Sequence, residues 1–248
     1  MESIKNYVLD YFNNNPTKIY LEGLISGGKS TLCRSIDVPM TKNNIAYRYY
    51  KEPINEKLLK LFYSNIKKYA FDFQTITIRE RVHVDNEATD FLLNGGKLAI
   101  IDRSCFGDAA FALMHHDANN INDEELDVYS DLIKNNKIKK CEHKQFLLYL
   151  NCTPRKCRQR VITRGNSDEI EKCDINYLEK LDQYYDKVLE HKPSNQIEKI
   201  VLDILKEQYP NLKIIYIDYE TDYEIKDGVL SEQDTLNILY QFIKLINN

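Results

Sequence analysis

The sequence is poor in several features that mark particular classes of protein. It has no tryptophan, eight glycines, six prolines and no apolar run close to membrane-spanning length in its 248 residues. A helix needs about 20 apolar residues to cross a bilayer, so a membrane protein is not expected. Residues 1–16 carry acids and asparagines and lack the apolar centre of a secretory or transit peptide.

An excess of positive charge is also absent, because the net charge is −4. No basic field is available to attract nucleic acid or an anionic membrane surface, and neither is an expected partner. The six cysteines show no CxxC spacing and no paired histidines nearby. We therefore interpret them as reduced, mostly buried thiols and expect a cytoplasmic protein.

The few glycines are concentrated in one place, since three of the eight lie within residues 23–28. Residues 23–31 fit GxxxxGK[ST], the phosphate-binding loop (P-loop) signature, with a strand-like run before them and a helical pattern after them. Glycines let this backbone turn tightly and aim its N–H groups at phosphate oxygens. The sequence therefore predicts binding of a nucleoside triphosphate. The expected binding residues are Gly23, Ser26, Gly27, Gly28, Lys29, Ser30 and Thr31.

Alternating strand and helix patterns fill the rest of the chain. Strands are predicted at 18–22, 45–50, 98–101, 145–150 and 213–217. Helices are predicted at 1–14, from the P-loop to a stop near Pro39, and at 55–68, 71–94, 105–119, 123–135, 154–164, 174–190, 195–208 and 231–246, with a polar loop at 165–173. We predict a single α/β domain over residues 1–248, with five parallel strands and helices on both faces.

In such a sheet the ligand lies beyond the carboxyl ends of the strands. Glu52 follows the second strand, and Asp102 and Arg103 follow the third. A carboxylate opposite the phosphates is well placed to accept a proton from an attacking hydroxyl group. The alternatives are an ordinary turn at Glu52 and a salt-bridged strand end at Asp102. Polar groups at several strand ends on one edge of the sheet favour a catalytic site over these alternatives.

Two helices carry polar residues in regular spacing. Gln74, Arg81 and Asp85 share one face of the helix at 71–94, and this spacing alone predicts a solvated surface. Arg160 and Arg164 form a like-charge pair that is unfavourable in a free helix and favourable where phosphates lie opposite. We interpret them as part of a mobile lid over the triphosphate, with a solvated basic face as the alternative.

Together these motifs resemble those of the deoxynucleoside kinases of the deoxycytidine, deoxyguanosine and deoxyadenosine kinase type, over residues 18–225. The elements occur in the family's order: the P-loop, Glu52-Pro53, Phe73-Gln74, Arg81, Asp102-Arg103-Ser104, Asp108, Arg160 to Gly165, and Tyr177-Leu178-Glu179. The resemblance implies a P-loop kinase fold with an arginine-rich lid at 158–173. It also implies ATP and Mg²⁺ as cofactors, a homodimer, and phosphorylation of the 5′-hydroxyl of a deoxynucleoside in nucleotide salvage.

The resemblance further implies roles for individual residues. Glu52 is expected to be the general base, and Gln74 to pair with the base edge of the nucleoside. The other expected catalytic residues are Lys29, Arg103, Arg160 and Arg164; the expected metal-binding residues are Ser30 and Asp102; and the loop expected to bind adenine contains Asp218 and Tyr223. The remaining expected substrate-binding residues are Ile54, Leu59, Phe62, Tyr63, Phe73, Arg81, Asp108, Ala112 and Glu169.

Two departures from the family pattern bear on the lid and on the choice of base. Asn166 stands where a third lid arginine is common, and Ala112 stands where many members have an aromatic residue. The small Ala112 leaves room for a two-ring base, and Asp108 is an acceptor that disfavours the O4 atom of thymine. We therefore expect deoxyadenosine or deoxyguanosine to be preferred, deoxycytidine to follow, and thymidine to be the poorest substrate.

Two other functions are compatible with a P-loop. A nucleoside-monophosphate kinase of the thymidylate kinase type also carries Glu-Pro and Asp-Arg after these strands, but is expected to have an acidic-basic pair where this chain has Phe73-Gln74-Thr75. A non-catalytic nucleotide-binding protein has no need of Glu52, Gln74 and Arg103 together. Both alternatives are disfavoured by these residues, and activity with a panel of nucleosides separates all three.

Overall fold

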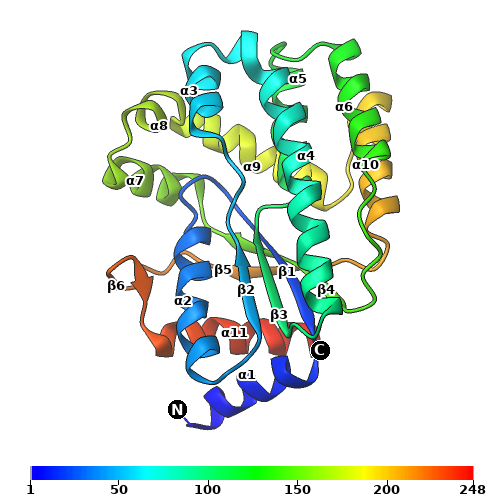
Figure 1. Ribbon diagram of the computed structural model, residues 1–248. Helices are drawn as coiled ribbons and strands as arrows, with labels where there is room; N and C mark the ends of the chain where they lie inside the picture. Colours follow the sequence, from blue (N-terminus) through cyan, green and yellow to red (C-terminus); the bar gives the residue numbers. More distant parts are fainter. Residues whose placement is uncertain (1, 248) are drawn as a thin grey trace.

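The computed structural model describes residues 2–247. Within them, five strands form one parallel sheet in the order β2-β3-β1-β4-β5 (Figure 1). The strands are β1 (Thr17–Glu22), β2 (Tyr47–Tyr50), β3 (Leu98–Asp102), β4 (Lys144–Asn151) and β5 (Lys213–Asp218). Because β1 lies in the middle and the chain winds outward on both sides of it, the predicted doubly wound sheet is confirmed.

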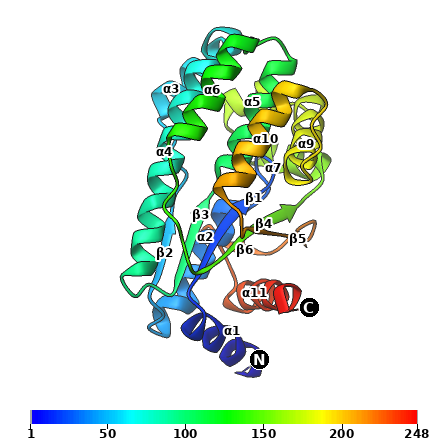
Figure 2. The same cartoon turned by 90° about the vertical axis from the view of Figure 1, so that its right-hand side faces the viewer.

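Helices cover both faces of this sheet (Figure 2). On one face lie α4 (Ile66–Leu93), α5 (Cys105–Asp117), α6 (Asp123–Asn135), α9 (Ile175–Leu189) and α10 (Gln196–Gln208). On the other lie α1 (Glu2–Asn14), α2 (Lys29–Lys42) and α11 (Glu232–Asn247). The remaining elements are α3 (Glu56–Ser64), α7 (Pro154–Arg164), α8 (Ser167–Lys172) and a hairpin of β6 (Ile225–Lys226) and β7 (Val229–Leu230).

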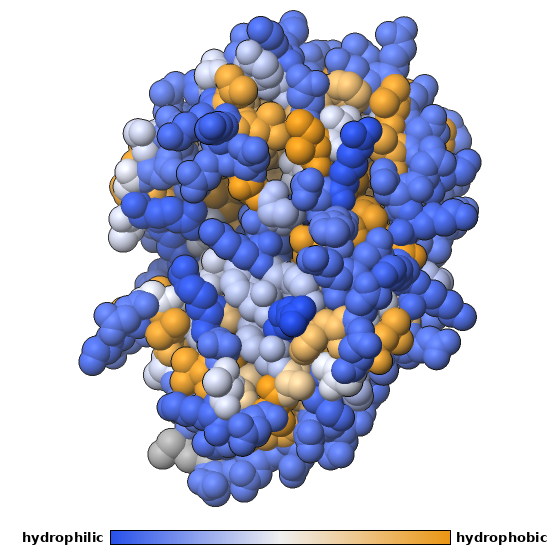
Figure 3. All heavy atoms as spheres, viewed as in Figure 1, coloured by the Kyte–Doolittle hydropathy of each residue, from blue (hydrophilic) through white to orange (hydrophobic). Residues whose placement is uncertain are grey.

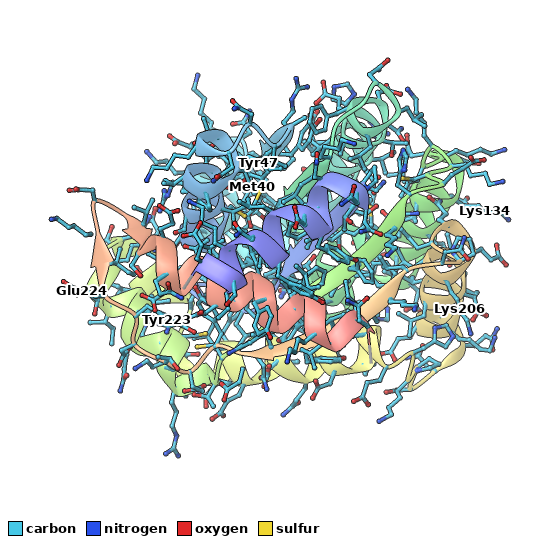
Figure 4. All side chains as sticks on the ribbon, turned by 90° about the horizontal axis from the view of Figure 1, so that it is seen from below. Met40, Tyr47, Lys134, Lys206, Tyr223 and Glu224 are labelled. Atoms are coloured by element: carbon cyan, nitrogen blue, oxygen red, sulfur yellow. The ribbon has the colours of Figure 1, made fainter. Side chains whose placement is uncertain are left out.

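Alternate side chains of each strand enter two hydrophobic clusters, one on each face. Tyr20 of β1 joins the cluster packed against α4, α5 and α9, whereas Ile19 and Leu21 join the cluster packed against α1, α2 and α11. Figure 4 shows α1 and α11 side by side across the second face, with Met40 and Tyr47 next to each other at its edge. Burial on both faces explains why β3 has an uninterrupted apolar sequence.

Three of the predicted helix boundaries are wrong. The helix α2 does not stop near Pro39 but continues to Lys42, because Pro39 and Met40 are buried and their packing offsets the one backbone hydrogen bond that proline removes. The break between α3 and α4 lies at Asn65, whose side chain accepts from the Lys68 N–H at 3.1 Å. The expected loop at 165–173 contains α8, which Asn166 caps.

The polar face of α4 is the largest error. Helical spacing alone placed Gln74, Arg81 and Asp85 in solvent, yet they are 1%, 5% and 1% exposed. For Gln74 and Arg81 the burial agrees instead with the substrate-binding positions that the resemblance implied. Arg81 and Asp85 are buried because each is paired with charges on other elements, and Gln74 faces a cavity. Helical spacing identifies a polar face, but it does not tell whether the facing elements carry partners for it.

Other local expectations are confirmed. Asn122 and Glu125 form the predicted capping box at the start of α6, and Thr153 and Asp174 cap α7 and α9. The six cysteines are buried free thiols. Along residues 2–247, no helix combines the length and the apolar character needed to cross a membrane.

Candidate active site

The P-loop connects β1 to α2 at the carboxyl end of the central strand. Gly23 and Gly28 have φ angles of 143° and 94°, in the region that favours glycine. A Cβ on Gly28 would lie 2.6 Å from the Tyr219 ring, so this position needs glycine for space as well. Lys29 is buried, and its ammonium donates to the carbonyl oxygens of Gly23 and Leu24 at 2.8 and 2.7 Å. Burial, with Arg103 nearby, lowers the pKa of Lys29 to about 8.

A hydroxyl and a carboxylate meet at the start of α2. Ser30 Oγ donates to Asp102 Oδ2 at 2.7 Å, and the Tyr49 hydroxyl donates to the same oxygen at 3.1 Å. The other oxygen, Asp102 Oδ1, is buried and has no hydrogen-bond partner among the described residues. Mg²⁺ prefers oxygen ligands and binds to proteins through one or two of them together with substrate phosphates and water. Ser30 and Asp102 therefore fit the expected metal site.

A groove of ≈ 780 Å³ extends from the P-loop between α7 and the segment that follows β5. Figure 3 shows the surface narrowing here on the left, between α7 above and the β6–β7 hairpin below. Tyr223, which Figure 4 labels on the loop before β6, lines the groove as expected. Asp218 does not line it, because this last residue of β5 is exposed and accepts from the Glu220 N–H; Tyr219 lines it instead.

The two lid arginines have different surroundings. Arg160 donates to Cys152 Sγ at 3.2 Å and to the Thr221 carbonyl at 3.2 Å, so it connects α7 to the segment after β5. It lines the groove but not the second cavity described below. Arg164 is paired with Glu169 at 3.1 Å and borders both the groove and a second cavity. Arg164 is thus the lid arginine at the junction of the two sites.

The second cavity has a volume of ≈ 130 Å³ and lies on the other side of the P-loop, between α3, α4, α5 and α9. The rings of Phe62 and Phe73 stack at 4.7 Å in its apolar wall. Of the expected substrate residues, those lining it are Glu52, Ile54, Leu59, Phe62, Tyr63, Phe73, Gln74, Arg81, Asp108 and Glu169. An apolar cavity with a few convergent polar groups is typical of a small-molecule site.

Ala112 is the exception among the expected substrate residues. It is fully buried within the packing of α5 and does not line the cavity. Phe111 lines it instead, and its ring lies 5.2 Å from the Arg103 guanidinium. The room that Ala112 was expected to leave for a two-ring base is therefore not found. Sequence reasoning missed Phe111, although its position three residues after Asp108 places both on one face of α5.

A network of four charges closes the polar end of the cavity. Glu52 Oε1 accepts from Arg81 at 2.8 Å and forms an ion pair with Arg103 at 3.0 Å, and Arg81 also donates to Asp108 at 3.0 Å. Burial alone would raise the pKa of Glu52, but Arg103 and Arg81 outweigh it and the pKa is lowered. Glu52 is therefore ionised at neutral pH, the state that a general base needs.

Three buried polar atoms at this end have no hydrogen-bond partner within the part of the chain that the structure describes. They are Gln74 Oε1, Arg81 Nη1 and Asp108 Oδ2. Two of them accept hydrogen bonds and one donates, so together they suit the polar edge of a flat, mixed donor-acceptor ligand. Burial raises the pKa of Asp108 to about 6, against the opposing effect of Arg81, so its carboxyl is mainly an acceptor at neutral pH.

A P-loop groove that adjoins a cavity with a paired carboxylate, on a five-stranded parallel sheet, defines a phosphoryl-transferring enzyme of the P-loop kinase fold. Residues 19–244 match the family described as deoxynucleoside kinase, and the chain belongs to this family. The resemblance noted in the sequence is thereby confirmed.

Individual relatives agree with this assignment. Deoxyguanosine kinase of Dictyostelium discoideum is 29% identical over 192 residues, which are 77% of this chain and 65% of that protein. Deoxycytidine kinase 2 of Gallus gallus is 27% identical over 239 residues, covering 82% of this chain and 87% of that one. A solved structure of deoxyadenosine kinase from M. mycoides has a TM-score of 0.64 at 20% identity and covers 92% of this chain and 98% of its own.

Proposed function

We propose that this protein transfers the γ-phosphoryl group of ATP to the 5′-hydroxyl of a 2′-deoxynucleoside. The observation that carries the proposal is the direct junction of the two sites. Ser26, Lys29, Ser30 and Arg164 line both the groove and the cavity, so a triphosphate in one ends where a nucleoside in the other begins. Formation of ADP from ATP with each of the four deoxynucleosides, and with their monophosphates, tests it directly.

Positioning and charge stabilisation do most of the work in phosphoryl transfer. The P-loop N–H groups hold the phosphates, and Lys29 balances their charge. Mg²⁺ held by Ser30 and Asp102 would neutralise charge on the phosphate oxygens. Glu52 accepts the proton of the 5′-hydroxyl, and Arg103, which already contacts Glu52, keeps the reacting oxygen near it.

The alternative of a nucleoside-monophosphate kinase is less compatible with the cavity. Such an enzyme needs a free cation for the substrate phosphate, and Gln74 is neutral. Arg81 is already engaged by two carboxylates, Glu52 and Asp108. A non-catalytic nucleotide-binding protein would gain nothing from holding Glu52 ionised between two arginines, because a buried charge pair gives little net stability. Phosphorylation of monophosphates but not of nucleosides would favour the first alternative.

We further propose that thymidine is the poorest substrate and that deoxynucleosides whose base carries an exocyclic amine are preferred over it. Relatives are named for guanine, cytosine and adenine deoxynucleosides, so membership of the family does not decide the base. The argument rests on Asp108 Oδ2, a buried acceptor for which residues 2–247 supply no hydrogen-bond partner. It can accept from an exocyclic amine, whereas the O4 atom of thymine would place two acceptors against each other.

Asp108→Ala is therefore expected to raise the ratio of thymidine to deoxyadenosine kcat/KM at least about tenfold, since one mismatched buried polar contact costs about 1–3 kcal/mol. The matched control is Asp117→Ala, an exposed acid on the same helix that pairs with Lys180 on the surface. Its ratio should stay at the wild-type value. Wild-type enzyme with thymidine as its best substrate, or an Asp108→Ala variant without any gain, would contradict the preference.

Arg164 is expected to act mainly on the charge that develops during transfer, because it lies where the two sites meet. Arg164→Ala should then lower kcat and kcat/KM together by about tenfold or more. Arg164→Lys should recover little, because lysine lacks the planar fork of donors. Steady-state kinetics against ATP measure both, with exposed Arg155→Ala on the same helix as control. A change confined to the KM for ATP would mean simple ground-state binding.

The homodimer, which the resemblance implies, and the cytoplasmic location, which the interpretation of the cysteines as reduced thiols implies, are proposals of their own. Neither is needed for the chemistry, since every residue named in the mechanism comes from one chain. Analytical ultracentrifugation tests the oligomeric state, and a single species at the monomer mass of 29.2 kDa would overturn that proposal.

A further inference from the structure

A buried carboxylate, Glu22, lies behind Arg103 and has no part in the mechanism above. Glu22 is 0% exposed at the end of β1. Its Oε1 atom accepts from Ser104 N at 2.6 Å, from Ser104 Oγ at 2.7 Å and from Gly107 N at 3.2 Å. A Cβ on Gly107 would lie 2.6 Å from this carboxylate, so the packing leaves room only for glycine. The start of α5 therefore fixes Glu22 in place.

Arg103 is held between this carboxylate and Glu52. Its Nε atom forms an ion pair with Glu52 Oε1 at 3.0 Å, while its Nη1 atom donates to the Tyr185 hydroxyl and lies 3.7 Å from Glu22 Oε2. The Tyr185 hydroxyl in turn donates to Glu22 Oε2 at 2.8 Å, and Tyr185 is fully buried. Arg103 also has a left-handed φ of 69°, so its backbone is held in an unfavourable conformation by these surroundings.

We propose that Tyr185 is a positioning residue whose hydroxyl separates Arg103 from Glu22 and thereby keeps the guanidinium directed at Glu52. Without the hydroxyl, Arg103 Nη1 loses an acceptor and Glu22 Oε2 loses a donor. A direct ion pair between them restores both interactions, and buried charges pair strongly where water is excluded. The guanidinium would then move away from Glu52. The inference rests on the proposed roles of Glu52 and Arg103.

The consequence for Glu52 follows from the charges that face it. They are Arg81 from α4, Arg103 from the β3–α5 connection and Lys29 from α2, with Asp108 behind Arg81 and Glu22 behind Arg103. Burial raises the pKa of Glu52, and Arg103 is one of the cations that lower it. Movement of Arg103 away from Glu52 should therefore raise the pKa of Glu52. Lys29 and Arg81 should stay in place, because neither donates to Tyr185.

The test is Tyr185→Phe, which removes only the hydroxyl group. We expect kcat to fall about ten- to a hundredfold, the loss typical of a small misplacement of a catalytic group, with both KM values unchanged. The acid limb of the pH profile of kcat/KM should move upward by about half to one pH unit. The matched control is Tyr149→Phe: Tyr149 is a buried neighbour of Tyr185 with ring centroids 5.3 Å apart, and its hydroxyl bonds Asp182 instead.

Glu22→Gln gives the opposite test, because it removes the charge that competes for Arg103. The acid limb of the pH profile of the Glu22→Gln enzyme should move to lower pH. General damage to the fold would not shift the acid limbs of Tyr185→Phe and Glu22→Gln in opposite directions. A Tyr185→Phe enzyme with wild-type kcat and acid limb, or a loss that Tyr149→Phe reproduces, would overturn the inference. If Glu52→Gln is inactive while Tyr185→Phe is unchanged, only the role of Tyr185 fails. If Glu52→Gln retains activity, the proposed mechanism fails first.

Discussion

Glu52→Gln is expected to lower kcat by at least a hundredfold while the Kd of the nucleoside changes little. Glutamine keeps the size of the side chain and an oxygen that can accept from Arg81 and Arg103, but it cannot take a proton from the 5′-hydroxyl. A positioned general base contributes about 10²–10⁴-fold to a rate. Steady-state kcat at saturating ATP and nucleoside measures the loss, and calorimetric titration of the nucleoside measures the Kd.

The pH profile adds a second readout. Two arginines lower the pKa of Glu52, so the wild-type acid limb should lie below the ordinary pKa of a glutamate, about 4.3, and should disappear in the variant. Glu56→Gln is the matched control, since Glu56 is exposed in the first turn of α3 and lines neither site. A Glu52→Gln enzyme that retains more than a tenth of wild-type kcat would remove Glu52 from the mechanism.

The position of Glu52 could be predicted from the sequence because it depends on topology alone. Residues that follow parallel strands reach one edge of the sheet, so Glu52 and Arg103 had to lie near the P-loop once the strands were recognised. Their 3.0 Å contact confirms this reasoning. Topology did not show that Arg81, from the middle of α4, pairs with Glu52; only the resemblance placed Arg81 in the substrate site.

The errors in the site residues share one physical cause: side-chain packing determines which of two residues adjacent in the sequence lines the ligand site. Ala112 and Asp218 each stand one residue from a larger aromatic side chain, Phe111 or Tyr219, that occupies the cavity or groove instead. A sequence motif locates a ligand-binding segment to within a residue or two. Which residue of that segment lines the site depends on side chains contributed by elements distant in the sequence. The same holds for α4, whose polar face is buried because β1 supplies a partner 67 residues away.

That partner is Lys18, and replacing it is expected to lower the stability of the fold strongly. Lys18 is 0% exposed, and its ammonium donates to Asp85 Oδ1 at 2.6 Å and to Thr89 Oγ1 at 2.9 Å. The hydroxyl groups of Tyr20 and Tyr209 donate to Asp85 Oδ2 at 2.8 and 3.0 Å. Lys18→Met leaves the Asp85 carboxylate buried without its counter-charge, which should lower the free energy of unfolding by about 3–5 kcal/mol.

Urea denaturation of wild type, Lys18→Met and the double variant Lys18→Met/Asp85→Leu measures this effect. The double variant should recover most of the loss, because removing both charges removes the desolvation penalty along with the attraction. Lys139→Met is the control, because Lys139 pairs at 2.5 Å with Asp90, which lies on α4 like Asp85. Both side chains of this pair are about half exposed, and such pairs contribute about 0–1 kcal/mol to stability. Equal losses in Lys18→Met and Lys139→Met would show that burial of the Lys18–Asp85 pair has no energetic consequence.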